Sequence, residues 1–134
     1  MSAYTFTVDI GLRFRDLDTM GHVNNAVYAS YLEQARAAYF DDVLDETLAD
    51  VGSVLAHLEI DYRQPIEYDD GTVTVATRVP SLGESSIPMR YEVRTPEAVA
   101  ATAETVQVVF DREAERPVSI PVDWSEKISA FEGL

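Results

Sequence analysis

The sequence contains no cysteine, which excludes disulfides, thiolate zinc sites and cysteine nucleophiles. It has only two histidines, His22 and His57, so we expect no metal site built from several imidazoles. The N-terminus has no basic segment followed by an apolar run, and no stretch approaches the roughly 20 apolar residues of a membrane span. We therefore expect a cytoplasmic protein. A length of 134 residues suits one domain, over residues 1–134.

Basic residues are also scarce. The chain has 10 Lys and Arg against 24 Asp and Glu, a net charge of -14, and Lys127 is its single lysine. So acidic a surface repels phosphate backbones and anionic lipid heads, and we expect neither nucleic acid nor membrane as a partner. A large acidic surplus with almost no lysine is also typical of proteins that work at high salt, where ions screen the self-repulsion. An ordinary acidic protein is the alternative interpretation.

The spacing of apolar residues predicts the elements. Residues 4–14 alternate between apolar and polar, which is typical of a half-buried strand. From Ala26 the period becomes helical, and Tyr28, Leu32, Ala35 and Tyr39 form one apolar stripe that we expect to end between Val43 and Leu48.

Four further strands are expected over residues 54–62, 73–79, 87–93 and 98–110, with a short final helix over 123–131. Pro88 predicts that the third of these strands starts late or lies at an edge. The fourth is long and mostly apolar, so we expect it at the centre of the sheet, ended by Arg116 and Pro117. Short connections predict antiparallel neighbours, and one slim helix against one sheet is an α+β fold.

We expect the chemistry in the segment between the first strand and the helix. It holds two carboxylates, a glycine, a histidine and two amides: Asp16, Asp18, Gly21, His22, Asn24 and Asn25. A helix N-terminus presents unpaired N–H groups and the positive end of the helix dipole, which can stabilise an oxyanion. A carboxylate a few residues earlier can act as base or nucleophile on the same carbonyl. The segment therefore has the groups needed for acyl transfer.

Each of these residues also has a structural interpretation. Asn24 or Asn25 can be the N-cap of the helix, and Asp16 can pair with a neighbouring arginine on the solvent face. His22 can be a hydrogen-bonded loop residue, and Gly21 can supply a positive φ. From the residues alone, these alternatives stay open.

The loop and helix share a motif with a known family. It reads D-L-D-x-x-G-H-V-N-N-x-x-Y over residues 16–28 and continues as Y-L-E-x-A-R over residues 31–36. Further matching stretches are I-D-Y-R-Q-P at 60–65, L-G-x-S-S at 82–86 and R-P-V-S-I-P at 116–121. Together they resemble the hotdog-fold acyl-CoA thioesterases of the 4-hydroxybenzoyl-CoA thioesterase-like superfamily.

The resemblance implies a five-stranded antiparallel sheet wrapped around a central helix, in a homodimer or homotetramer with its sites at the subunit interface. It implies an acyl-CoA substrate, with coenzyme A part of that substrate and no other cofactor or metal. Where the plant acyl-carrier-protein thioesterases have an asparagine, this chain has Met20, which favours coenzyme A thioesters.

The resemblance also assigns residues. Asp18 matches the loop carboxylate that serves as base or nucleophile, and the backbone N–H near Asn25 matches the donor to the thioester carbonyl. Some relatives carry His or Tyr at that position, so no side-chain role is carried over to Asn25. A helix carboxylate from the partner subunit acts in other branches, which makes Glu33 the alternative catalyst.

The remaining site residues are expected to bind or position the substrate. They are Gly21, His22 and Asn24 in the loop, Tyr28 on the helix, Arg63 as a candidate for the phosphates, and Ser85, Ser86 and Arg90 around the turn where relatives contact coenzyme A. The leading hypothesis is an acyl-CoA thioesterase. A non-catalytic acyl-CoA-binding module is one alternative. A hydratase or dehydratase on the same fold, using His22, is another.

The charge pattern generates a prediction about salt. If the chain is adapted to high salt, its melting temperature should rise steadily as KCl is raised from millimolar to molar concentrations, because screening relieves repulsion among its carboxylates. Thermal unfolding followed by circular dichroism measures this. A melting temperature that does not change with salt would leave the chain an ordinary acidic protein.

Overall fold

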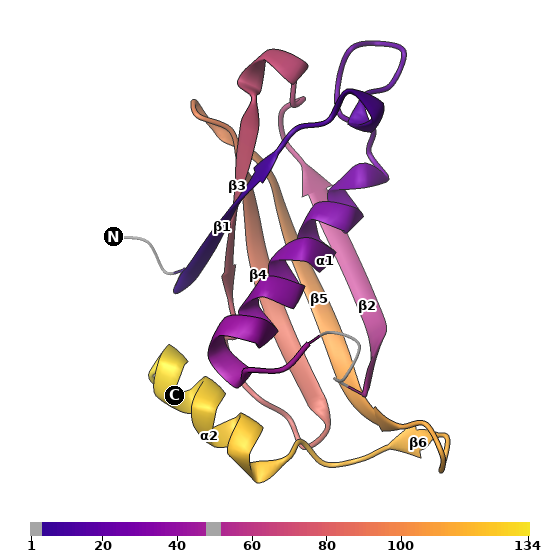
Figure 1. Cartoon of the computed structure of the whole chain (residues 1–134), viewed down its shortest axis with the longest axis vertical. Helices are drawn as coiled ribbons and strands as arrows, with labels where there is room; N and C mark the ends of the chain where they lie inside the picture. The colour runs from indigo at the N-terminus through magenta and orange to yellow at the C-terminus, as the bar shows by residue number, and fades with distance from the viewer. Residues whose placement is uncertain (1–3, 48–51) are drawn as a thin grey trace.

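The computed structural model describes residues 4–47 and 52–134. Its strands and helices are β1 (Phe6–Gly11), α1 (Val27–Tyr39), β2 (Ser53–Tyr62), β3 (Thr72–Arg78), β4 (Ser86–Arg94), β5 (Val99–Asp111), β6 (Arg116–Pro117) and α2 (Val122–Glu132). Every strand pairing is antiparallel, and the order across the sheet is β1-β3-β4-β5-β2, with β6 paired to β5. Helix α1 lies across one face of the sheet, and α2 lies near one end of it (Figure 1).

The core forms between α1 and the sheet. The apolar stripe predicted for the helix is buried, and Tyr31 joins it. The facing side chains alternate along the strands, as in Val73 and Val75 of β3 and Met89 and Tyr91 of β4. The α+β class and the central helix predicted from the sequence are therefore confirmed.

Helix α1 ends through a wider turn over Phe40–Leu44, after which Asp45 adopts a left-handed conformation with φ 56°. The helical turns thus end at Leu44, within the predicted interval from Val43 to Leu48. Leu48 itself lies outside the described residues. The Tyr39 hydroxyl, at the end of α1, donates to Glu132 Oε2 over 2.6 Å, and the Val79 N–H donates to the same oxygen over 3.1 Å. Glu132 thus fastens α2 to both α1 and the end of β3.

Three expectations need correction. The first strand ends at Gly11, because the chain then makes a 3-10 turn over Phe14–Asp16, and Phe14 is 77% exposed instead of buried. Pro88 marks neither a late start nor an edge, since β4 begins at Ser86 and lies between β3 and β5. However, β3 pairs with β4 only from Arg90 onward, so Pro88 has a neighbour on one side alone. Arg116 and Pro117 do not simply end the long strand but return to pair with it as β6.

Strand β2 forms one edge of the sheet and leaves apolar side chains uncovered. Val54, Leu55, Leu58 and Tyr62 are each 41–47% exposed. By register with β5, Leu55, Leu58 and Tyr62 lie on the face that carries α1 but beyond the cover of the helix. An apolar edge strand of ten residues is a surface that natural proteins usually cover.

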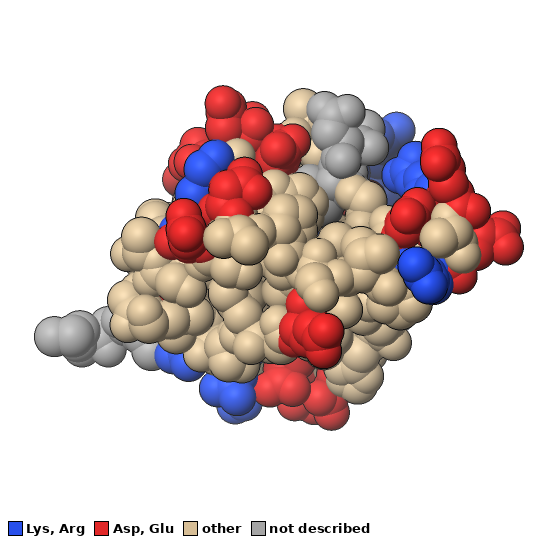
Figure 2. Space-filling model, turned by 90° about the horizontal axis from the view of Figure 1, so that it is seen from below, with Lys and Arg blue, Asp and Glu red and all other residues tan. Residues whose placement is uncertain are grey.

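Figure 2 views the molecule from the end where α2 and β6 lie, and shows acidic groups surrounding an uncharged surface with few basic side chains among them. Within the part of the chain that is described, no helix combines the length and the hydrophobicity that a membrane crossing requires.

Candidate functional site

A hollow of about 240 Å³ lies where the loop before α1 meets the end of β2. Its lining residues are Asp18, His22, Val23, Asn25, Tyr28, Tyr62, Arg63, Gln64 and Pro65. Five of the residues predicted from the sequence therefore surround one space: Asp18, His22, Asn25, Tyr28 and Arg63. Tyr62 and Gln64 were not among the predicted site residues, although both lie in the I-D-Y-R-Q-P stretch that directly follows the edge strand.

The carboxylate of Asp18 is held through one oxygen. Its Oδ1 accepts hydrogen bonds from the N–H groups of Met20, over 2.9 Å, and His22, over 3.2 Å. The Asp18 N–H in turn donates to the His22 carbonyl over 2.7 Å, and Gly21 closes the turn with φ 80°, the positive value anticipated for it. Asp18 Oδ2 accepts no hydrogen bond from any described residue, so this oxygen is available to a bound molecule.

The backbone just before α1 is tied at nearly every polar group. The Asn24 N–H donates to the Asp16 carbonyl over 2.8 Å, and the Asn24 carbonyl accepts from the Val27 N–H over 2.9 Å. The next peptide is held at both ends, because Asn24 Oδ1 accepts from the Ala26 N–H and the Tyr62 hydroxyl donates to the Asn25 carbonyl. Across residues 4–47 and 52–134, nothing accepts a hydrogen bond from the Asn25 N–H. It is therefore a free donor beside the hollow.

These bonds also correct the expected helix cap. The N-cap of α1 is Ala26, which makes no side-chain capping bond. The Asn24 side-chain oxygen instead accepts a hydrogen bond from the N–H of Ala26, two residues further on, in a turn immediately before the helix. The Asn25 side chain is exposed.

Asp16 anchors the loop to the helix. Its carboxylate is 2% exposed and accepts hydrogen bonds from the Tyr31 hydroxyl over 2.8 Å and from the Arg13 N–H over 3.1 Å, with the Arg13 guanidinium 3.1 Å away. The predicted pairing with an arginine is present, but its placement on the solvent face was wrong. Burial alone would raise the pKa of Asp16, yet these hydrogen bonds and the Arg13 charge outweigh burial and set the pKa below its ordinary value.

Two tyrosines form the apolar wall of the hollow. The rings of Tyr28 and Tyr62 meet edge to face with centroids 4.9 Å apart. Burial, with a smaller contribution from Tyr62, raises the pKa of Tyr28 to about 12, so its hydroxyl stays protonated at neutral pH. At the rim, His22 Nε2 lies 3.9 Å from Glu67 Oε1.

The predicted residues Glu33, Ser85, Ser86 and Arg90 do not line this hollow. Glu33 is on the exposed face of α1, in a separate hollow with Ser30, Gln34 and Ala37. Ser86 begins β4 at the end of the sheet away from the loop, roughly 26 Å from the last residue of that strand by the rise of about 3.3 Å per residue. Ser85 precedes it. Within one chain, these residues are not brought to Asp18.

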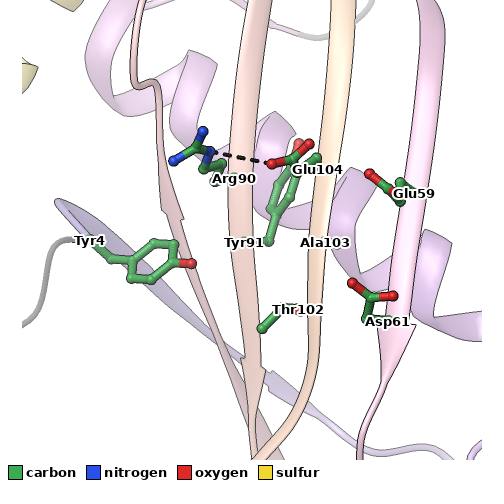
Figure 3. A pocket seen from close by; sticks show the side chains of 8 residues that line it. All are labelled: Tyr4, Glu59, Asp61, Arg90, Tyr91, Thr102, Ala103 and Glu104. Atoms are coloured by element: carbon green, nitrogen blue, oxygen red, sulfur yellow. Dashed lines mark ion pairs between the residues drawn. The ribbon is translucent and has the colours of Figure 1, made fainter.

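Arg90 lies on the opposite face of the sheet from α1. It lines a second hollow there and its Nε is 3.4 Å from Glu104 Oε1 (Figure 3). Glu59 and Asp61 of β2 face the same space, so acidic groups outnumber the arginine. In the described ranges, no three side chains of the types His, Cys, Asp and Glu are grouped so that they could hold a metal ion.

Comparison with known proteins places this geometry among thioesterases. The family model described as the thioesterase-like superfamily matches residues 12–128. A thioesterase from Thermus thermophilus, whose crystal structure contains coenzyme A and zinc, superimposes with a TM-score of 0.90, 39% identity, and 100% and 98% of the two chains covered.

Two more relatives are similar over most of their length. A predicted thioesterase from Bacillus stearothermophilus gives a TM-score of 0.85 at 29% identity, covering 94% of this chain and 95% of the other. The long-chain acyl-CoA thioesterase FadM of Escherichia coli is 29% identical over 124 residues, which are 89% of this chain and 93% of FadM.

The Asp16 anchor generates a prediction about acid stability. The substitution Asp16→Asn should lower the free energy of unfolding at pH 7 by about 1.5–3 kcal/mol, because it removes charge-assisted hydrogen bonds. Since the native pKa lies below the ordinary 3.8, the carboxylate stabilises the fold above that value and loses this effect as pH falls through the native pKa. As the pH is lowered from 5 through the native pKa, the free energy of unfolding of the variant should therefore fall less than that of the wild type.

Urea unfolding at a series of pH values measures this difference. The exposed carboxylate of Asp42 supplies the control, and Asp42→Asn should follow the wild-type curve. Identical acid profiles for Asp16→Asn and the wild type would show that the Asp16 hydrogen bonds do not contribute.

Proposed function

We propose that this chain, which belongs to the thioesterase-like superfamily and is a thioester hydrolase, acts on acyl-CoA. The products of the proposed reaction are a free acid and coenzyme A. One observation carries the proposal. The unbonded oxygen of Asp18 and the free N–H of Asn25 border the same hollow, at the N-terminal end of α1.

The two groups suit opposite sides of a thioester carbonyl. The Asn25 N–H donates to the carbonyl oxygen and, with the positive end of α1, stabilises the oxyanion; one such donor contributes about 3 kcal/mol to a transition state. Asp18 Oδ2 takes a proton from a water that attacks the carbonyl carbon, or attacks that carbon itself to form an anhydride that water then hydrolyses. In both routes one water is consumed, and the sulfur leaves as the thiol after taking up a proton.

The other loop residues hold these groups in place. Gly21 allows the turn that brings the His22 N–H to Asp18, and the Asn24 amide orients the peptide after Asn25. Tyr28 supplies an apolar wall for the acyl group. Arg63, at the edge of the hollow, suits a phosphate of coenzyme A in a protein whose net charge otherwise repels it.

A second copy of the chain completes the site in this proposal. Strand β2 is an uncovered apolar edge, and antiparallel pairing with its own copy would place the start of the partner's β2 beside Tyr62. Ser53 pairs with Val109 of β5, and Ser86 pairs with the adjacent Val108. The partner's turn with Ser85 and Ser86 would therefore approach the hollow, where its serines can bind coenzyme A. Glu33 of the partner remains the alternative catalytic carboxylate.

Asp18→Asn tests the chemistry without disturbing the loop. The amide oxygen can still accept the two N–H bonds that Oδ1 accepts now, but the carboxylate is gone. Turnover over a panel of acyl-CoAs should fall at least about 100-fold, within the range for losing a catalytic base or nucleophile. The release of free thiol measures the rate.

Asp9 offers a matched control. Its Oδ1 accepts a hydrogen bond from the Thr74 hydroxyl over 2.7 Å, and it lies on β1, at the edge of the sheet opposite to β2. Asp9→Asn should therefore leave turnover unchanged. A folded Asp18→Asn variant with full activity would remove Asp18 from the role proposed for it.

The assembly is tested at Leu58. Leu58→Lys places a charge on the uncovered edge strand and should convert the dimer to a monomer that has lost most of its coenzyme A affinity, because burying an unpaired charge costs several kcal/mol. Val122, which is 73% exposed on α2, gives the control Val122→Lys. Sedimentation equilibrium measures the mass. A wild-type protein that is monomeric and fully active would contradict this arrangement.

A further inference from the structure

We propose that Tyr62 is a positioning residue, which holds the peptide after Asn25 so that the Asn25 N–H points into the hollow as an oxyanion donor. The inference rests on the proposed function, since it concerns the geometry of the same site. It adds a residue outside the loop to the groups on which turnover depends.

The hydrogen bonds around Asn25 support this role. The Tyr62 hydroxyl donates to the Asn25 carbonyl over 2.7 Å, and Asn24 Oδ1 accepts from the N–H at the other end of that peptide over 2.9 Å. The peptide plane is thus fixed at both ends. The preceding peptide is fixed through its carbonyl, which accepts from Val27, while its N–H is the free donor of Asn25. Rotation about the Asn25 backbone would move that donor, and the two held peptides prevent it.

The hydrogen bond from Tyr62 differs from the other two because it comes from a residue distant in the sequence. The bonds from Asn24 and Val27 are local, whereas Tyr62 is 37 positions from Asn25 in the sequence and belongs to β2. Its backbone is paired with Ala101 of β5, and its ring packs edge to face on Tyr28, which is itself buried. The sheet therefore sets the position of the hydroxyl, and the hydroxyl relates the start of α1 to the sheet.

The direction of the bond separates positioning from direct catalysis. A phenol hydroxyl can donate one hydrogen bond, and Tyr62 donates it to the Asn25 carbonyl. The same hydroxyl is then not a donor to the thioester or to the leaving sulfur. Tyr62 contributes through the Asn25 peptide, and its loss should affect the carbonyl of a bound substrate more than the rest of the molecule.

The experiment compares Tyr62→Phe with Tyr68→Phe. Both tyrosines are about half exposed, at 47% and 48%, but Tyr68 lies outside the hollow. With the best acyl-CoA substrate, kcat of Tyr62→Phe should fall about tenfold, the effect of one neutral hydrogen bond, while KM stays within about twofold. Tyr68→Phe should match the wild type. An unchanged kcat, or a rise in KM alone, would overturn the inference.

Two non-hydrolysable ligands give a second measurement. In one, a methylene replaces the thioester sulfur and the carbonyl is kept as a ketone; in the other, an S-alkyl thioether, the carbonyl is absent. Tyr62→Phe should bind the ketone about twofold more weakly, in keeping with the small change expected for KM, and the thioether as the wild type does. Equal losses for both ligands would mean that Tyr62 contacts the ligand elsewhere, which also overturns the inference.

The proposed function can fail separately. A wild-type protein that binds both ligands but hydrolyses no acyl-CoA would contradict the proposed hydrolysis, while the comparison of ketone with thioether would still decide the role of Tyr62. The amide signal of Asn25 in a nitrogen-15 spectrum adds a readout without substrate. It should shift and exchange faster in Tyr62→Phe but not in Tyr68→Phe, and an unchanged signal would count against the inference.

Discussion

The carboxylate of Asp16 is buried between the loop and α1, and the geometry of the site depends on the bonds it makes there. Its side chain is held by Tyr31 of the helix and by Arg13, two residues after β1 ends, while its carbonyl accepts the N–H of Asn24. A buried carboxylate is stable only when it is paired and hydrogen-bonded, so this arrangement permits little variation. One residue therefore ties the loop to the helix and also links two parts of the loop, at Arg13 and at Asn24.

With the loop fixed in this way, its unused groups become significant. The first N–H groups at a helix N-terminus have no partner within the helix, so one that borders a hollow is available to a bound molecule. Here the free donor is at Asn25 and the free carboxylate oxygen is at Asp18, and they border one space. A thioester carbonyl needs a donor at its oxygen and a base or nucleophile at its carbon, which is the pair that this loop leaves available.

Much of this was predictable from the sequence, because periodicity reports which faces are buried. The apolar stripe of α1, the long strand β5 in the interior of the sheet, and the position of Asp18, His22 and Asn25 beside one another were predicted. Phe14 was not, since an alternating pattern cannot indicate where a buried carboxylate turns the chain. The role proposed for Asn25 likewise depends on a hydrogen bond from Tyr62, which is distant in the sequence and carries no local signal for that bond. Ser85, Ser86 and Glu33 lie away from the hollow of their own chain, so a role for them stays a prediction that needs the second copy proposed above.

The proposed hydrolysis requires that one carbonyl be held between Asp18 and the Asn25 N–H. A crystal structure of the protein with the ketone analogue of its best acyl-CoA substrate would show whether it is. We expect the ketone oxygen within about 3 Å of the Asn25 nitrogen, with Asp18 Oδ2 facing the carbonyl carbon directly or through one water. A ketone oxygen bound to other groups, with the Asn25 N–H still free, would refute this arrangement.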